Sequence, residues 1–590
     1  MSNNLEISGA QIVLEALKEQ EVDTIFGYPG GAVLPIYDAL FGQNFLKHIL
    51  VRQEAGAVHA AEGYARSSGK VGVLLVTSGP GATNVVTGLT DALMDSIPIV
   101  CLTGQVPTHL IGTDAFQECD TTGITRPCTK YNYLVKDITK LSESIHEAFE
   151  IAKSGRPGPV LVDIPKNIQL AKSTYVSKKS ISFRPHRIKS GAKEISKDFI
   201  EALISHIKKS SKPILYVGGG CLNSGPIASQ KLKEFAELTN IPVTTTLHGL
   251  GCYPGEGKLS IGMLGMHGTY EANLAMHDCD LMINVGARFD DRITGRLDAF
   301  SPNSTKFHFD IDRSSIDKNV KVDFATNTDI THSLTSINEY IRSNNIEFNH
   351  SQFNPWWDQI KQWQSKDCLK YDQSKEIIKP QHAITRLNEL TKNKNTIITT
   401  EVGQHQMWAA QYYKFNKPNS WITSGGLGTM GFGMPAAIGA QLANPDSLVI
   451  DIAGEASFLM NVQEIATAVQ YKLPIKIFIL NNEYMGMVRQ WQELMHGSRY
   501  SESYVDALPD FLKLAESFNA VGLRAKNLNE LDDTINEMIS VDRPVIADIW
   551  VDKTENCFPM IPSGAPHNEM LLSKYDEEDP ENQEKGKVLV

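Results

Sequence analysis

Residues 447–482 read SLVIDIAGEASFLMNVQEIATAVQYKLPIKIFILNN, and this stretch decides the fold class of the chain. An apolar run, LVIDIA, ends at Gly454 and Glu455, and a second apolar run, IKIFIL, ends at Asn481 and Asn482. Apolar residues between the two runs recur with helical spacing, so the pattern predicts a strand, a helix and a second strand. Because such a crossover is right-handed and joins parallel strands, we expect Glu455 and Asn482 side by side at one edge of a parallel sheet.

A carboxylate and an amide oxygen at neighbouring strand ends suit a hard divalent cation. Mg²⁺ prefers oxygen ligands and keeps open positions for phosphate oxygens. The spacing alone leaves two interpretations open. Glu455 and Asn482 form a magnesium site, or they belong to an acidic turn and an asparagine-rich turn of the kind that any α/β protein contains.

The same alternation of apolar strand, glycine-rich turn and amphipathic helix runs along the whole chain. It predicts an α/β protein with three consecutive doubly wound domains, each built on a mostly parallel sheet. Polar stretches at about 172–197 and 343–380 are interpreted as linkers on the surface. The resulting boundaries are 1–185, 190–345 and 375–565, with a tail at 566–590. From Asp576 onward we expect the tail to be frayed or ordered only by contacts.

The composition excludes several classes of protein. Lys and Arg number 56 against 68 Asp and Glu, a net charge of −12 without a basic block, which argues against binding to nucleic acid or an anionic membrane surface. The eight cysteines include no CxxC pair, so we expect reduced thiols and no zinc site. No apolar run is long enough to span a membrane, and the first residues lack a signal-peptide pattern. These features predict a cytoplasmic protein.

Glu54 stands where a strand is expected to end and a helix to begin, in LVRQEAGAVHAAEGYAR (50–66). Open α/β sheets bind ligands at this edge. An acid at a helix N-terminus is also favourable without any ligand. Position alone leaves both interpretations open.

The middle of the chain carries a different ligand signal. The expected strand PILYV runs into three glycines, 218–220, which allow close approach of the backbone to a phosphate. The expected strand LMINVG leads into RFDDR (288–292), and KFHF ends near Asp310, whose carboxylate can bind ribose hydroxyls. The alternative is a structural α/β domain with charged loop ends.

Several longer motifs are distributed along the chain. They are YPGGAVLPIYDAL (28–40), RQEAGAVHAAEGYAR (52–66), TSGPGATN (77–84), TGQVPTHLIGTDAFQE (103–118), RPGPVLVDIPKN (156–167), TEVGQHQMWAA (400–410), GGLGTMGFGMPAAIGA (425–440) and NNEYMGMVRQWQE (481–493). Together they resemble the acetohydroxyacid synthases, a family of thiamin-diphosphate-dependent enzymes. The resemblance covers about residues 5–565. The family's cofactor motif is GDG…NN, from which this chain departs at Glu455 and Ala456.

The resemblance implies a catalytic and a metal-binding set. Glu455, Asn482 and the backbone carbonyl of Tyr484 are implied to hold Mg²⁺. Glu54 is implied to hydrogen-bond the pyrimidine ring of thiamin diphosphate and to exchange a proton with it. Such a proton exchange needs a shielded carboxyl group.

The resemblance also implies how substrates are held. Arg292 is implied to contact the carboxylate of a 2-keto acid, and Trp491 to narrow the pocket in favour of 2-oxobutanoate. Phe116, Gln117 and Lys166 match other active-site positions. By position alone, Trp491 equally fits core packing and Lys166 a solvated lysine at a strand end.

The resemblance assigns the first domain to the pyrimidine, the central domain to FAD and the last domain to the diphosphate and Mg²⁺. The implied FAD positions are Arg156, Gly219, Leu264, Gly265, Met266, His267, Gly286, Arg288, Asp290, Asp310 and Ile311. The other implied cofactor positions are Gly31, Ser96, Val402, Gly403, Gln404, His405, Gly428, Met430, Ala456, Ser457 and Met487. Met430 is implied to support the bent thiamin diphosphate. The RFDDR stretch favours the FAD-dependent, biosynthetic form over a catabolic relative without FAD.

The implied reaction decarboxylates pyruvate and condenses the hydroxyethyl unit with pyruvate or 2-oxobutanoate, giving 2-acetolactate or 2-aceto-2-hydroxybutanoate. This is the first common step of branched-chain amino-acid biosynthesis. The resemblance also implies a homodimer or homotetramer with active sites between chains, and it leaves a small regulatory subunit open. Two rival interpretations remain: a decarboxylase or FAD-dependent pyruvate oxidase of the same superfamily, and a non-catalytic subunit that only binds.

Overall fold

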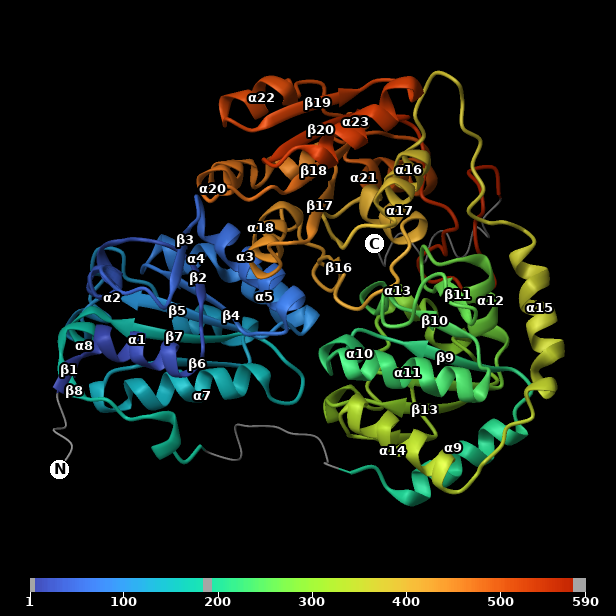
Figure 1. Ribbon diagram of the computed structural model, residues 1–590, viewed down its shortest axis with the longest axis horizontal. Helices are drawn as coiled ribbons and strands as arrows, with labels where there is room; N and C mark the ends of the chain where they lie inside the picture. Colours follow the sequence, from blue (N-terminus) through green and yellow to red (C-terminus); the bar gives the residue numbers. More distant parts are fainter. Residues whose placement is uncertain (1–5, 184–193, 577–590) are drawn as a thin grey trace.

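Three six-stranded parallel sheets form the framework of the computed structural model, which describes residues 6–183 and 194–576 (Figure 1). The first sheet comes from the N-terminal third of the chain (blue in Figure 1), the central sheet from the middle (green) and the last sheet from the C-terminal third (orange and red). Buried apolar clusters cover both faces of each sheet. The prediction of an α/β fold with three doubly wound parallel sheets is confirmed. Each sheet with its helices is called a lobe below.

The first sheet has the order β3-β2-β4-β5-β7-β6, with β2 Thr24–Tyr28, β3 Lys47–Leu50, β4 Gly72–Val76, β5 Ile99–Gln105, β6 Tyr131–Leu134 and β7 Val160–Pro165. The central sheet has the order β11-β10-β9-β12-β13-β14, with β9 Pro213–Val217, β10 Val243–Thr245, β11 Ser260–Met263, β12 Leu281–Val285, β13 Thr305–Phe309 and β14 Phe324–Thr326. The last sheet has the order β16-β15-β17-β18-β20-β19, with β15 Thr396–Thr400, β16 Trp421–Ile422, β17 Leu448–Ala453, β18 Lys476–Asn481, β19 Val521–Ala525 and β20 Val545–Trp550. A short antiparallel pair joins β1 Glu6–Ser8 to β8 Lys172–Thr174.

The helices of the first lobe are α1 Gly9–Glu19, α2 Leu34–Leu40, α3 Glu54–Ser68, α4 Pro80–Asn84, α5 Val86–Asp95, α6 Thr121–Thr125, α7 Leu141–Lys153 and α8 Lys166–Leu170. Those of the central lobe are α9 Lys197–Lys209, α10 Gly220–Asn223, α11 Pro226–Thr239, α12 Tyr270–Asp278, α13 Asp291–Thr294, α14 Ile330–Ser343 and α15 Asn354–Gln364. Those of the last lobe are α16 Pro380–Thr391, α17 Gln404–Tyr412, α18 Gly433–Ala443, α19 Glu455–Leu459, α20 Ile465–Gln470, α21 Gly486–Met495, α22 Phe511–Ser517 and α23 Leu528–Ser540.

Local sequence signals explain where α1 begins and which face it buries. Ser8 caps the helix by accepting from the backbone N–H of Gln11, and the Gln11 side chain returns a bond to Ser8. The apolar residues Ile12, Val13 and Leu17 are buried against the first sheet. Helical spacing of apolar residues thus fixes the orientation of α1.

Each sheet has a switch point where the strand order changes direction, and open α/β sheets bind ligands there. The switch lies between β2 and β4 in the first sheet, between β9 and β12 in the central sheet and between β15 and β17 in the last sheet. The loops that follow these strands carry the glycine-rich and acidic motifs of the sequence. The fold therefore places the predicted site residues at three sheet edges.

The prediction of a surface linker over 343–380 is wrong for the middle of that stretch. It forms α15, in which Trp356 and Ile360 are buried. The indole of Trp356 donates to the carbonyl of Pro213 (3.1 Å), which anchors α15 to the start of β9. Part of the other proposed linker, 184–193, and the tail from 577 onward lie outside the described residues.

Helix α3 of the first lobe packs directly on α18 of the last lobe (Figure 1). A Cβ at Gly63 would collide with the carbonyl of Ala436, and a Cβ at Gly439 would collide with the carbonyl of Ala60. Only glycine, which has no side chain, allows the backbones to approach this closely. The first and last lobes are joined by a helix contact that leaves no room for a methyl group.

Two further expectations concern cysteines and membranes. All eight cysteines are free thiols within the described structure. No helix of the described residues has the length and apolar character needed to cross a membrane.

Candidate functional site

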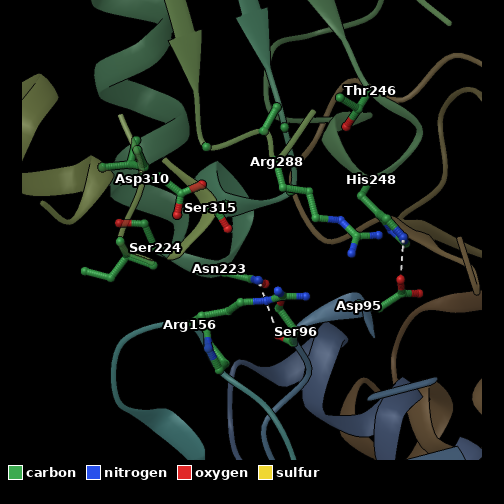
Figure 2. Close-up of a pocket in the computed structure, with 18 of the residues that line it drawn as sticks. Asp95, Ser96, Arg156, Asn223, Ser224, Thr246, His248, Arg288, Asp310 and Ser315 are labelled. Carbon is green, nitrogen blue, oxygen red and sulfur yellow. Dashed lines mark hydrogen bonds and ion pairs between the residues drawn. The ribbon is translucent and has the colours of Figure 1, made fainter. Parts of the chain in front are cut away.

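A cavity lies between the carboxyl edge of the central sheet and the end of α5 in the first lobe (Figure 2). We call it the Arg156 cavity. The glycine loop 218–220 after β9 and the loop after β12 line one side, and Asp310 after β13 lines another. A Cβ at Gly218 would collide with the carbonyl of Gly286. The loops after β9 and β12 therefore pack backbone against backbone at the edge of the cavity.

Two arginines point into the Arg156 cavity (Figure 2). The guanidinium of Arg156 is held in place because it donates to Ser96 Oγ (2.7 Å) and to the carbonyl of Met94 (2.9 Å). Burial lowers the pKa of Arg156, and the nearby charge of Arg288 lowers it further. Two guanidinium groups that repel each other favour an anion such as a diphosphate between them.

The residues predicted to bind FAD are divided between two adjoining cavities. Those that line the Arg156 cavity are Arg156, Gly219, Gly286, Arg288, Asp290, Asp310 and Ile311, together with Ser96. Leu264, Met266 and His267 line the neighbouring cavity, and Gly265 belongs to the same turn. The cationic pair and the Asp310 carboxylate suit the diphosphate and ribose of FAD, so the residues present fit this cofactor.

The neighbouring cavity combines a cation with an apolar wall, and we call it the Trp491 cavity. Trp491 and Met487 project into it from α21, Arg292 from α13 and Gly428 from the loop before α18. The guanidinium of Arg292 lies 3.2 Å from the Asp291 carboxylate and remains half exposed. A small anionic substrate with an apolar tail fits such a cavity.

The predicted metal ligands lie side by side at the edge of the last sheet. Glu455 begins α19 directly after β17, and Asn482 follows the adjacent strand β18. Tyr484 comes two residues later, and its backbone N–H donates to Asn482 Oδ1 (3.2 Å). Between them, Glu483 has a φ of 58°, a conformation that is uncommon outside glycine.

The carboxyl group of Glu455 is buried without a hydrogen-bond partner among the described residues. It is 1% exposed, and among the described residues neither oxygen accepts a hydrogen bond of good geometry. Burial raises the pKa of Glu455 to about 8, although the nearby backbone N–H groups of Tyr484 and Asn482 act in the opposite direction. Leaving such a group unpartnered is costly, and a cation would remove the cost. The set of oxygen donors fits Mg²⁺.

A third cavity adjoins the metal ligands, and we call it the His405 cavity. Its lining includes the predicted residues Val402, Gly403, Gln404, His405, Met430, Ala456, Ser457, Asn482, Tyr484 and Met487. A Cβ at Gly454 would lie 2.7 Å from His405 Nδ1, so backbone and imidazole are in close contact. Burial lowers the pKa of His405 to about 3, and its Nε2 lacks a hydrogen-bond partner among the described residues. With its proton on Nε2, the neutral imidazole can donate to a phosphate oxygen.

Glu54 lies elsewhere, at the carboxyl edge of the first sheet. It is half-buried as the first residue of α3, and its Oε2 accepts from Asn84 Nδ2 (2.9 Å). It lines none of the three cavities formed by the described residues.

Four other predicted residues share this edge with Glu54. Gly31 is exposed after β2, and Lys166 begins α8 after β7. Gln117 has a φ of 59° and packs on Gly79. Phe116, beside it, is 88% exposed. Within one chain the fold brings the central and last-lobe residues together with Ser96 and Arg156 of the first lobe. It leaves the residues at the Glu54 edge apart from them.

Sequence reasoning missed several polar residues between the lobes. Asp95, at the end of α5, and His248, after β10, lie 3.0 Å apart although they belong to different lobes. His59, Glu62 and Asp91 form a second cluster, fully buried between α3 and α5. Asp95 precedes the predicted Ser96, but no pattern in the sequence pairs it with His248.

Three family models match the chain, and each describes part of a thiamine pyrophosphate enzyme. The N-terminal TPP binding domain matches residues 7–124, the central domain matches residues 200–337 and the C-terminal TPP binding domain matches residues 401–549.

Curated relatives are similar to this chain over nearly its full length. It is 47% identical to the acetolactate synthase isozyme 3 large subunit of Escherichia coli, over 97% of this chain and 99% of the relative. It is 46% identical to the acetolactate synthase large subunit of Haemophilus influenzae, over 97% of this chain and 99% of the relative. It is 47% identical to the mitochondrial acetolactate synthase catalytic subunit of Saccharomyces cerevisiae, over 96% of this chain and 84% of the relative.

Proposed function

Since the chain belongs to the acetolactate synthase family of thiamine pyrophosphate enzymes, we propose that it decarboxylates pyruvate and joins the two-carbon unit to a second 2-keto acid. With pyruvate as acceptor the product is 2-acetolactate, and with 2-oxobutanoate it is 2-aceto-2-hydroxybutanoate. The reaction is the first common step of branched-chain amino-acid biosynthesis. The family's cofactors are thiamin diphosphate, Mg²⁺ and FAD.

The buried, unpartnered carboxyl of Glu455 beside Asn482 carries the proposal, because this pair needs a cation and its surroundings suit a diphosphate. Thiamin diphosphate, when bound, supplies the carbanion chemistry of 2-keto-acid decarboxylation. The test is pyruvate turnover with each cofactor omitted in turn. Acetaldehyde or peroxide as product would indicate a decarboxylase or an oxidase instead, and cofactor binding without turnover would indicate a non-catalytic subunit.

The chain's own residues have separate tasks in this proposal. Glu455, Asn482 and the Tyr484 carbonyl would hold Mg²⁺, and His405 would hydrogen-bond a phosphate oxygen. Arg292 orients the substrate carboxylate in the Trp491 cavity. The Glu54 carboxyl would hold a proton at the site of the pyrimidine ring. The cofactors are assigned by domain: pyrimidine to 1–185, FAD to 190–345, and diphosphate with Mg²⁺ to 375–565.

We propose further that the active site lies between two copies of the chain. Among the described residues, Glu54 and Gln117 line neither the Trp491 cavity nor the His405 cavity. Apolar side chains are exposed at the sheet edge of Glu54 and Gln117, with Phe116 88% and Leu34 53% accessible. Exposed apolar groups around predicted active-site residues favour burial by a second copy.

We therefore expect activity only from a dimer or a larger assembly. Light scattering and turnover measured over one dilution series would show activity falling together with the dimer fraction. A monomer with full activity at assay concentration would contradict the shared site.

Trp491→Leu is expected to shift acceptor preference from 2-oxobutanoate toward pyruvate. The two acceptors differ by one methylene, which changes the ratio by roughly 10- to 200-fold in an apolar pocket. Competition assays with both acceptors measure the ratio directly. Met407→Leu, in the same cavity wall, is the matched control and should leave the ratio nearly unchanged. An unaltered ratio in Trp491→Leu would make Trp491 a packing residue.

The relatives are described as large or catalytic subunits. We infer that this chain is likewise the catalytic subunit and that a smaller regulatory partner binds it. Copurification with a tagged chain tests this inference. The cytoplasmic location stays a prediction.

A further inference from the structure

Asp95 contacts elements of all three lobes. It ends α5 in the first lobe, and its side chain is completely buried. Its Oδ2 accepts from the backbone N–H of Gly425 (2.9 Å) and its Oδ1 from that of Gly426 (2.6 Å), both in the loop before α18 of the last lobe. Oδ1 also lies 3.0 Å from Nε2 of His248, which belongs to the central lobe (Figure 2). One carboxylate thus holds a loop and a side chain from two other lobes.

The loop before α18 packs tightly against Asp95, with no room for an added methyl group at Gly425 or Gly426. A Cβ at Gly425 would collide with His248 Nε2. A Cβ at Gly426 would lie 2.5 Å from Asp95 Oδ1 and 3.0 Å from Arg288 Nη2. A shift of the loop must therefore move Asp95, His248 or Arg288, because packed groups do not deform independently.

Arg66 completes the cluster and determines which ring nitrogen of His248 carries the proton. Its guanidinium donates to the carbonyl of Thr423 (3.0 Å), at the start of the same loop, and to Nδ1 of His248 (3.3 Å). An Nδ1 that accepts carries no proton, so the imidazole proton lies on Nε2, which is 3.0 Å from Asp95 Oδ1 but makes no hydrogen bond of good geometry to it. Although burial raises the pKa of Asp95, the contacts with His248 and Arg66 lower it to about 2, so the carboxylate is ionised.

Both sides of this cluster face cofactor cavities. Asp95, His248 and Arg288 line the Arg156 cavity, which fits FAD. His248, Arg288, Gly425 and Gly428 line the Trp491 cavity, and Met430 of the same loop lines the His405 cavity, which fits thiamin diphosphate. The Asp95 carboxylate therefore joins residues that line the cavities on both sides.

We infer that Asp95 is a positioning residue that couples the binding of FAD to the binding of thiamin diphosphate, so that each cofactor raises the affinity for the other. The inference rests on the proposed function, which supplies the two cofactors. FAD orders His248 and Arg288, these order Asp95, and Asp95 fixes the loop before α18. Binding linkage requires the effect to be equal in both directions.

Affinities measured in both directions test the coupling. FAD is titrated into the cofactor-free assembly with and without saturating thiamin diphosphate and Mg²⁺, followed by flavin fluorescence. Thiamin diphosphate is then titrated with and without FAD, followed by calorimetry. In the wild type each cofactor should tighten the other by about tenfold, within the usual range for coupled sites.

The variants assign the coupling to Asp95. Asp95→Asn should reduce the factor to about one. Because Asp95 lines the Arg156 cavity, its direct effect on FAD affinity is measured without thiamin diphosphate and cancels from the factor, which is a ratio of two FAD affinities. Should Asp95→Asn not fold, His248→Leu removes the contact of His248 with Asp95, together with its hydrogen bond from Arg66, and is expected to give the same loss of coupling. Asp91→Asn is the matched control, because Asp91 accepts from Ser424 Oγ (2.8 Å) on the same loop but lines no part of the Arg156 cavity. It should retain the coupling.

The outcomes separate this inference from the proposed function. Cofactors that bind tightly but independently in the wild type would overturn the coupling and leave the function intact. Unchanged coupling in Asp95→Asn or His248→Leu, or an equal loss in Asp91→Asn, would overturn the role of Asp95. Failure of the wild type to bind either cofactor would overturn the proposed function and this inference with it.

Discussion

Replacing Glu54 with glutamine is expected to lower kcat by roughly 10²- to 10⁴-fold, the usual contribution of a positioned acid or base. The amide keeps the shape of the side chain, and its carbonyl oxygen can still accept from Asn84 Nδ2, as Glu54 Oε2 does. It cannot take up and release a proton. The measurement is steady-state turnover of pyruvate under saturating cofactors, together with thermal unfolding to show that the fold is retained.

The control for this prediction is Glu143→Gln. Glu143 lies on α7, which covers the other face of the first sheet from α3, and its only charge partner among the described residues is Lys140 (3.0 Å). This variant should have wild-type kcat. A kcat near wild type for Glu54→Gln would remove Glu54 from the mechanism.

Glu455→Ala is expected to weaken Mg²⁺-dependent binding of thiamin diphosphate by roughly 10- to 100-fold or more, because even residues that only support a metal ligand cost this much. Excess Mg²⁺ should restore activity poorly. Glu455→Asp should be tolerated, because removing one methylene withdraws the carboxylate by only ~1.5 Å, which the hydrated cation can absorb. Calorimetric titration of thiamin diphosphate at several Mg²⁺ concentrations compares the three proteins.

Stability without cofactors separates a metal ligand from a structural residue. Glu455→Gln keeps the side-chain volume and removes a buried carboxyl without hydrogen-bond partners, so the cofactor-free Tm should stay level or rise. Asp280→Asn is the contrasting control. Asp280 accepts from the backbone N–H groups of Ser211 (2.7 Å) and Lys212 (3.0 Å) at the amino end of the central sheet, so its loss should lower Tm and leave Mg²⁺ dependence intact. If Glu455→Ala binds metal and cofactor normally, Glu455 is a turn residue.

Most of the fold could be predicted because its strands are apolar runs separated by glycine-rich turns. The residues 447–482 specify β17 and β18 almost to the residue. Helix α15 was missed although Trp356, Ile360 and Trp363 recur with helical spacing, because polar composition hid a narrow apolar stripe. The order of the strands within each sheet could not be predicted, because no local sequence pattern indicates which strands pair.

The sequence likewise predicts some features of the candidate site and not others. Glu455 and Asn482 could be placed together because a right-handed crossover determines where two successive parallel strands end. The roles of Glu54, Arg292 and Trp491 came from resemblance, not from spacing. The contact of Asp95 with His248 depends on how three lobes pack, and residues so distant in sequence carry no shared periodicity.

The contact between α3 and α18 also sets an order of events on the ribosome. Domains fold as units and N-terminal ones fold first during synthesis. When the first lobe emerges, however, the partner of its helix face around Ala60 and Gly63 has not yet been translated. That face, with His59 and Glu62 next to it, stays hydrated on the nascent chain until residue 443 has left the exit tunnel. The earliest-made lobe is therefore among the last parts of the molecule to reach its final packing.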